Sequence, residues 1–352
     1  MTGARPESTT RPLLVVDNLK TQFATPRGRL RAVDGVSFQL GVGETFGIVG
    51  ESGSGKSVLA RSIMNLLPAS ARVSGDHILF DGRDLQTMSS YDLKHFWGPE
   101  IAMVFQDPMT SLNPVKKVGV QITESMRYHL GLSKAEATKR ALDLMHEVGI
   151  PEPKRRLHQY PHELSGGMRQ RIAIAIALAC EPRLLIADEP TTALDVTVQK
   201  QILELLARLQ RERGMALILI THDFGVVSGM ADRIAVMYAG QLVESGGAVE
   251  TFSDVKHPYT EALLASIPQF DQPSHTRLQA IGGRPPDMVN PPTGCRFAPR
   301  CKYAQDLCRT SPPAYANPTS PDHFFRCFFP VDNKSSGAVG SQRSHAHLEV
   351  SA

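Results

Sequence analysis

Residues 45–58 read TFGIVGESGSGKSV, and this short stretch decides the fold. The apolar run Thr45–Val49 predicts a buried strand, and Gly50–Ser57 matches the pattern G-x-x-x-x-G-K-[ST] without a mismatch. A helix is expected to follow over residues 57–67 and to end before Pro68. A strand, a glycine-rich loop and a helix in this order predict a phosphate-binding loop.

The residue types in this loop suit a nucleoside triphosphate. Glycines let successive backbone N–H groups point at a β-phosphate, and the following helix adds its positive N-terminal end. Lys56 would place a compact charge between the β- and γ-phosphates, and the Ser57 hydroxyl is a candidate Mg²⁺ ligand. The candidate ATP-binding residues of the loop are Gly50, Glu51, Ser52, Gly53, Ser54, Gly55, Lys56, Ser57 and Val58. This motif alone is shared by kinases, GTPases, helicases and transporters.

Two acidic residues end a second apolar run, Leu185–Glu189. An acid at the tip of a buried strand, close to the phosphates, suits Mg²⁺ coordination, and this role is assigned to Asp188. Glu189 is then placed to orient and deprotonate the attacking water. The alternative, a solvated strand end, is disfavoured by the phosphate loop in the same chain.

A second anion-binding pattern lies upstream, where residues 164–171 read LSGGMRQR. Ser165 is a natural N-cap, and two glycines and the start of a helix follow it. Taken alone, this pattern is only a turn that starts a helix. One protein rarely needs two phosphate cradles for one nucleotide, and the pair makes sense if the second serves an ATP held by another subunit. Its residues are Leu164, Ser165, Gly166, Gly167, Met168, Arg169 and Gln170.

The motifs of this chain, and their order along the sequence, resemble those of ABC ATPases. LSGGMRQR, LLIADEP (184–190) and TTALD (191–195) are similar to the signature, Walker B and D-loop of that family. MVFQDP (103–108) resembles its Q-loop, and THD (221–223) resembles its switch histidine. The resemblance covers about residues 13–255 and implies an α/β fold of the P-loop NTPase class. That fold has a RecA-like α/β core, an antiparallel β subdomain and a helical subdomain.

The resemblance also implies a mechanism. Two subunits would pair head to tail, and each ATP would lie between the Lys56 loop of one and the Ser165 signature of the other. Gln106 would contact Mg²⁺ together with Ser57 and Asp188, and His222 would contact the γ-phosphate.

The remaining roles complete the site that the resemblance implies. Glu189, His222 and Gln106 form the catalytic set, and the D-loop residue Asp195 would link the two sites. Phe23 is the candidate for stacking on adenine, with strand core as its alternative reading. Many ABC pairs contain one degenerate member that has lost the Walker B glutamate. Glu189 is present here, so this chain is expected to hydrolyse ATP.

Composition and periodicity divide the chain into four parts. Residues 1–11 are expected to be disordered, and residues 12–255 to form the nucleotide-binding domain, with its helical subdomain at about 112–175. Residues 256–332 form a proline- and cysteine-rich C-terminal extension, and the polar stretch 333–352 is expected to be disordered.

Local signals refine this division. They predict turns at residues 26–28 and 34–35, a hairpin after His77–Phe80, and a capping box at Ser133–Glu136. Strands that alternate with helices beyond residue 180 predict a parallel sheet.

The segment after the cassette begins His257-Pro258-Tyr259, which predicts a helix start. It also resembles the segment that opens the C-terminal extension of oligopeptide and dipeptide permease ATPases. Nickel and glutathione importers share much of this pattern.

Four of the five cysteines lie in this extension, spaced C-x₅-C-x₆-C-x₁₈-C at Cys295, Cys301, Cys308 and Cys327. Four thiolates can bind zinc or an iron–sulfur cluster, and the C-x₂₋₄-C pair usual in structural zinc sites is missing from the spacing. Wider spacing favours a bulkier cluster, and the family resemblance implies a [4Fe–4S] cluster at these positions. Zn²⁺ and free thiols are the alternatives.

The whole sequence narrows the class further. Its formal charge of +3 and mixed acidic and basic content do not suggest a nucleic-acid binder. The N-terminus has no apolar segment of a secretory signal, and the run Ile172–Cys180 is too short to cross a bilayer. The chain is therefore expected to be soluble and cytosolic, and the family resemblance implies that partner proteins hold it peripherally at the cytoplasmic face of the inner membrane.

Together with the family resemblance, these observations predict the ATP-hydrolysing subunit of an ABC importer, and the resemblance of the C-terminal segment favours oligopeptide or dipeptide uptake. The expected partners are a second, homologous ATPase, two transmembrane permeases and, indirectly, an extracytoplasmic substrate-binding protein. A nickel or glutathione importer ATPase is the alternative. A soluble ABC ATPase of DNA repair is disfavoured, because the sequence shows no long coiled coil and no basic surface. Partner chains choose the substrate, so the sequence leaves it open, together with the choice between homodimer and heterodimer.

Overall fold

The structure is a computed structural model that describes residues 11–107, 111–192, 194–266, 281–320 and 322–331. The predicted disordered ends, 1–11 and 333–352, lie outside these residues except for Arg11. In the described part of the chain, no helix is both long enough and apolar enough to span a membrane.

A small antiparallel sheet carries the N-terminal part of the chain. Its strands are β1 (Leu14–Thr25), β2 (Gly28–Leu40), β4 (Ala71–Ser74), β5 (His77–Phe80) and β6 (Arg83–Asp84). The order is β2-β1-β5-β6, with β4 also paired to β1. The hairpin predicted after β5 is present, and its two turn residues both have positive φ, as a tight hairpin turn requires.

The predicted turn at Asp34-Gly35 is wrong. Strand β2 runs through it, and the ladder passes from Leu19 opposite Val36 to Lys20 opposite Asp34. Gly35 is skipped and has a φ of 77°, so it forms a bulge that only a residue tolerant of positive φ accepts readily.

The main sheet has the order β12-β13-β11-β10-β3-β9-β8-β7. Its strands are β3 (Thr45–Val49), β7 (Ile101–Val104), β8 (Leu184–Asp188), β9 (Ala216–Thr221), β10 (Arg233–Tyr238), β11 (Gln241–Gly247), β12 (Ala316–Ser320) and β13 (His323–Phe325). Strands β10, β3, β9, β8 and β7 are parallel, as predicted. The other three are antiparallel, because β10 and β11 form a hairpin and β13 returns from the C-terminal region.

The helices follow the predicted pattern with one shortened member. They are α1 (Lys56–Ile63), α2 (Ser90–Phe96), α4 (Val118–His129), α5 (Lys134–Glu147), α6 (Pro153–Arg156), α7 (Gly166–Leu178), α8 (Val196–Arg213), α9 (Phe224–Met230), α10 (Ala248–Ser253), α11 (Pro258–Ala265) and α12 (Asp306–Thr310), with 3₁₀ turns at Pro161–Glu163 and Ala298–Arg300. Helix α1 ends at Ile63, earlier than expected, because Asn65 has a left-handed φ of 51°. The capping box at Ser133 and Glu136 is present.

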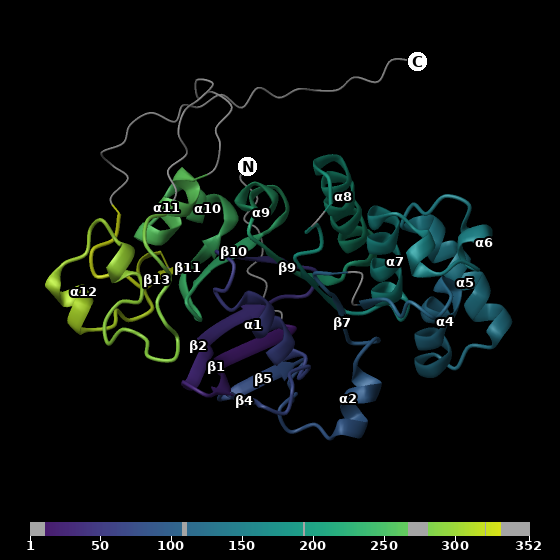
Figure 1. The fold of residues 1–352 in the computed structure, drawn as a ribbon, viewed down its shortest axis with the longest axis horizontal. Coiled ribbons are helices and arrows are strands. Elements are labelled where there is room, and N and C mark those ends of the chain that lie inside the picture. Colours follow the sequence, from purple (N-terminus) through teal and green to yellow (C-terminus); the bar gives the residue numbers. More distant parts are fainter. Residues whose placement is uncertain (1–10, 108–110, 193, 267–280, 321, 332–352) are drawn as a thin grey trace, which may run out of the picture.

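The molecule has three regions around the main sheet (Figure 1). A lobe of α4–α7 lies at one end, the small sheet lies beside α1, and the C-terminal region with α12 lies at the opposite end. Helix α1 buries Leu59, Ala60 and Ile63 in a core shared by both sheets. Because α1 begins in the phosphate loop, this packing fixes the loop against the sheet.

The C-terminal region, which comprises the described residues after 255, is joined to the nucleotide-binding domain (the cassette) by the main sheet and a shared core. Strand β13 pairs with β11, placing Phe325 opposite Glu244. Tyr259 and Phe297 pack in one buried cluster with Tyr238 of β10. The proline-rich region thus shares its core with the main sheet.

Candidate functional site

The loop Gly50–Ser57 connects β3 to α1. At two of its glycines, neighbouring backbone leaves no room for a side chain. A Cβ at Gly50 would lie 2.2 Å from the Met237 carbonyl oxygen, and one at Gly55 would lie 2.3 Å from that of Ala32. Both residues have positive φ. The spacing of glycines in the motif therefore reflects the close approach of neighbouring strands as well as room for a ligand.

Lys56 extends back over this loop. Its Nζ donates hydrogen bonds to the carbonyl oxygens of Gly50 (2.8 Å) and Glu51 (3.0 Å). Glu189 Oε1 lies 3.9 Å from the same nitrogen. The side chain is 4% exposed, and burial lowers the pKa of Lys56. An anionic ligand in the loop would therefore find a cation with little water around it.

Ser57 and Asp188 form the second part of the site. Ser57 Oγ donates a hydrogen bond of 2.8 Å to Asp188 Oδ1. Asp188 ends β8, is fully buried, and its pKa is raised by burial. The other oxygen, Oδ2, is buried without a hydrogen-bond partner among the described residues. A buried oxygen left in this state fits a cation, so the residues present suit Mg²⁺.

Glu189 lies at the centre of the predicted catalytic set. Its Oε2 accepts hydrogen bonds from Gln106 Nε2 (3.0 Å) and Thr192 Oγ1 (2.9 Å), and His222 Nδ1 lies 3.4 Å away. The backbone of Glu189 has a φ of 45°, a strained value that such a network can hold in place. The structure thus brings Glu189, Gln106 and His222 together, and their catalytic roles stay predictions.

A cleft opens beside the phosphate loop. Of the predicted residues, its walls contain Phe23, Ser52, Gly53, Gly55, Lys56, Ser57, Val58, Gln106 and Glu189. Phe23 of β1 lies opposite Leu30 of β2, and both side chains reach this cleft. Phe23 is half-buried in the cleft wall, so it is placed to meet a flat apolar ligand.

The predicted signature lies elsewhere in the fold. Ser165 caps α7, accepting a hydrogen bond from the Met168 N–H (3.3 Å), and is exposed together with Gly166. Asp195 caps α8 in the same way, and the neighbouring Val196 is 80% exposed. Neither cap lines the cleft described above. Leu164 and Gln170 are buried, while Gly167, Met168 and Arg169 are half-buried.

Three residues of the C-terminal region also reach the site, and sequence reasoning missed them. The Tyr259 hydroxyl accepts a hydrogen bond from the Glu51 N–H (2.9 Å), and Arg300 pairs with the Glu51 carboxylate. Met288 lines the cleft with Phe23. The only sequence signal in this region was the His257-Pro258-Tyr259 segment, and it did not indicate that Tyr259 contacts Glu51.

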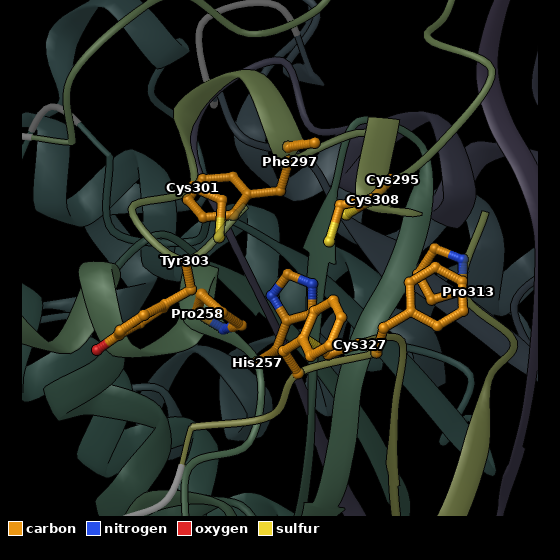
Figure 2. Close-up of a pocket in the computed structure, with 12 residues that line it drawn as sticks. His257, Pro258, Cys295, Phe297, Cys301, Tyr303, Cys308, Pro313 and Cys327 are labelled. Carbon is orange, nitrogen blue, oxygen red and sulfur yellow. The ribbon is translucent and has the colours of Figure 1, made fainter. Parts of the chain in front are cut away.

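The four cysteines of the C-terminal region gather around one small cavity. Cys295, Cys301, Cys308 and Cys327 all line it, and Phe328 and Phe329 are among its apolar lining residues. Figure 2 shows the sulfur atoms of Cys301 and Cys308 turned toward the His257 ring. His257 is neutral, because burial lowers its pKa to about 3.

The chemistry of these thiols sets limits on a metal. Burial raises the pKa of Cys295 and Cys301, and raises that of Cys327 to about 12. Such thiols keep their protons unless a metal cation displaces them. Among the residues that the structure describes, no group of three or more His, Cys, Asp or Glu side chains is arranged to hold a metal ion. The region therefore supplies four sulfur donors around one space without a preset site for a single ion.

Two protein-family models match the sequence. One, described as ABC transporter, matches residues 33–192. The other, described as oligopeptide/dipeptide transporter, C-terminal region, matches residues 243–308. The second match includes Cys295, Cys301 and Cys308 and ends before Cys327.

Curated relatives match over most of the chain. It is 50% identical to the dipeptide transport ATP-binding protein DppD of Escherichia coli (strain K12), over 91% of this chain and 98% of that protein. It is 54% identical to the oligopeptide transport ATP-binding protein OppD of Bacillus subtilis (strain 168), over 84% of this chain and 83% of that protein.

Solved structures of ABC transporter proteins share the fold. The dimeric structure of MJ0796, a bacterial ABC transporter cassette, matches with a TM-score of 0.61 and 27% identity, over 67% of this chain and 98% of that one. CbiO1 from Clostridium perfringens, part of the ABC transporter complex cbiONQ, matches with a TM-score of 0.58 and 30% identity, over 69% and 92%.

Proposed function

Since this chain belongs to the ABC transporter family, among the ATP-binding proteins of oligopeptide and dipeptide transport, we propose that it hydrolyses ATP to drive peptide uptake through partner permeases. One observation carries the proposal. The phosphate loop, Gln106 and Glu189 line one cleft although they come from distant parts of the sequence, and the buried Asp188 is hydrogen-bonded to Ser57 of that loop.

The residues of this cleft would divide the work of binding. Backbone N–H groups of the loop and Lys56 Nζ would hold the β- and γ-phosphates, and Phe23 would stack on the adenine. Ser57, Asp188 and Gln106 would hold Mg²⁺, which supplies charge neutralisation at the phosphates when bound. Lys56 would exchange its two present carbonyl acceptors for phosphate oxygens.

The chemical step would depend on Glu189. Its carboxylate, oriented by Gln106 and Thr192, would accept a proton from the attacking water. His222 lies beside the same carboxylate and would contact the γ-phosphate, so that it reports the state of the nucleotide. Hydrolysis at this site would therefore depend on side chains from three separate segments, those that follow β7, β8 and β9.

We propose that two ATPase subunits share each ATP. Ser165 and Asp195 are exposed at helix starts outside the cleft of their own chain, where a second subunit could meet them. The dimeric state of the MJ0796 cassette supports this arrangement. We favour a heterodimer with a homologous ATPase, bound peripherally to two permeases at the cytoplasmic face of the inner membrane and served by an extracytoplasmic binding protein.

Purification of the intact complex tests this function. Mass spectrometry should find this protein, a second, homologous ATPase and two permeases in one particle. Proteoliposomes that contain the particle should take up labelled peptide only when ATP is supplied on the ATPase side. Uptake of nickel or glutathione instead of peptide would support the alternative substrates, and co-purification with DNA and without membrane proteins would refute the transporter reading.

For the four cysteines we propose a [4Fe–4S] cluster, with Zn²⁺ as the alternative. Four sulfur donors around one apolar cavity support this proposal. Anaerobic purification should yield about four irons and four sulfides per chain, with visible absorption that is lost in air. Colourless anaerobic protein, with one zinc or with no metal, would contradict the cluster.

A further inference from the structure

A buried arginine of the C-terminal region holds the one acidic residue of the phosphate loop. Arg300 Nη1 donates to Glu51 Oε2 at 2.7 Å, and Arg300 Nη2 donates to Glu51 Oε1 at 2.9 Å. The Arg300 side chain is 3% exposed and that of Glu51 is 29% exposed. This is a two-pronged, charge-assisted pair, the strongest kind of side-chain hydrogen bond.

Arg300 is fixed from its own side as well. Its Nε donates to the Gly282 carbonyl oxygen (2.9 Å), its Nη2 also to that of Ile281 (3.2 Å), and its Nη1 also to the Tyr238 hydroxyl (3.3 Å). The guanidinium carbon lies 5.7 Å from the centre of the Tyr238 ring. The guanidinium is therefore held in position independently of Glu51.

The N–H, the carbonyl oxygen and the carboxylate of Glu51 all have hydrogen-bond partners. Its N–H donates to the Tyr259 hydroxyl, its carbonyl oxygen accepts from Lys56 Nζ, and its carboxylate binds Arg300. The carboxylate does not line the nucleotide cleft. Burial lowers the pKa of Lys56, and Glu51 is among the acidic groups that act in the opposite direction, so the two charges interact.

An unpaired carboxylate at this position would oppose ATP binding. It would repel the phosphates and would compete with them for Lys56, since like charges close together in a partly buried site are costly. We propose that Arg300 is a positioning residue for ATP binding, which neutralises Glu51 and keeps its carboxylate out of the cleft. This inference rests on the proposed nucleotide site.

Other contacts attach the C-terminal region to the cassette around the same cleft. The Arg31 N–H donates to the Met288 carbonyl oxygen (3.0 Å), and Arg296 pairs with Asp34. These contacts, and the pairing of β13 with β11, do not involve Arg300. Loss of the Arg300 side chain should therefore leave the region attached and change mainly the phosphate loop.

The test uses the full chain and measures ATP binding by calorimetry in the presence of Mg²⁺. Arg300→Met should raise the Kd for ATP about tenfold, and Arg300→Lys should have a smaller effect, because lysine keeps the charge without the fork. Adding Glu51→Gln to Arg300→Met should restore the Kd to within about threefold of native, because the repelling charge is then gone. The matched control is Arg309→Met, at an exposed arginine of α12.

Two further readouts separate positioning from loss of structure. The defect of Arg300→Met should shrink at high salt, and kcat at saturating ATP should stay within about twofold of native while KM rises. A native Kd in both folded Arg300 variants, or a defect that Glu51→Gln fails to relieve, would overturn the inference. If Lys56→Ala also binds ATP like the native chain, the nucleotide site itself is wrong and not only the role of Arg300.

Discussion

Gln106 Nε2 donates a hydrogen bond of 3.0 Å to Glu189 Oε2, which joins the loop after β7 to the end of β8. The two residues are 83 positions apart in the sequence. In the proposed reaction this bond, with that from Thr192, orients the Glu189 carboxylate that would accept a proton from water.

The first prediction concerns this carboxylate. Glu189→Gln should abolish turnover, with a loss of at least about 100-fold, because the amide cannot accept the proton. ATP binding should remain, since the size of the side chain and its contact with Thr192 are kept. Steady-state ATPase assays and calorimetry on the same preparation measure both quantities.

Its control is Glu212→Gln, at the exposed end of α8, which should hydrolyse ATP at the native rate. Hydrolysis by Glu189→Gln at the native rate would show that another group removes the proton.

The second prediction concerns the buried oxygen of Asp188. Asp188→Asn keeps an acceptor for the Ser57 hydroxyl but removes the charge that suits a cation, so the Kd for ATP with Mg²⁺ should rise roughly tenfold or more. Without Mg²⁺, the variant should bind ATP as well as the native chain or better, because a carboxylate near the phosphates is gone. Titrations with Mg²⁺ and with EDTA compare the two cases, and an equal loss in both would contradict the assigned role.

Sequence patterns predicted the parts of the site that local order sets. A strand, a glycine-rich loop and a helix are consecutive, so the positions of Lys56 and Ser57 follow from spacing. Asp188 and Glu189 end a buried strand, and the parallel sheet places that end beside the loop. These elements are short-range, and their amino-acid preferences agree with the global fold.

Such local patterns could not predict the contacts of the C-terminal region. Arg300 lies 249 positions from Glu51, in a proline-rich segment where an arginine resembles any surface arginine. The addition of β13 to the main sheet likewise depends on pairing with β11, which three residues of strand do not signal. Gly35 was misjudged because a bulge and a turn use the same residue types.

The third prediction concerns Glu244, a fully buried carboxylate on β11. It accepts hydrogen bonds from the N–H groups of Lys256 (2.7 Å) and His257 (3.0 Å) and from His323 Nε2 (2.9 Å). In Glu244→Gln, either orientation of the amide turns its NH₂ group toward a donor. The free energy of unfolding should fall by about 1–3 kcal/mol.

Chemical denaturation measures this loss, and Glu204→Gln, at an exposed position on α8, is the matched control. An unchanged denaturation midpoint for Glu244→Gln would show that the C-terminal region is held without this residue.

The last prediction concerns alkaline pH. The Tyr315 hydroxyl is hydrogen-bonded to Ser245, Arg326 lies over its ring, and burial raises the pKa of Tyr315 to about 12. An unfolded tyrosine has a pKa near 10, so between these values the unfolded chain releases a proton that the folded chain keeps. The contribution of Tyr315 to stability is therefore complete below about pH 10 and is lost as the pH rises toward 12. Because the ring is partly exposed, this loss of stability should be roughly 1–2 kcal/mol. Denaturation midpoints of the native chain and of Tyr315→Phe, measured between pH 10 and 12, separate the contribution of Tyr315 from that of other titrating groups. Tyr315→Phe should be less stable at neutral pH and should lose less stability between pH 10 and 12, whereas parallel curves for the two chains would show that Tyr315 titrates alike in both states.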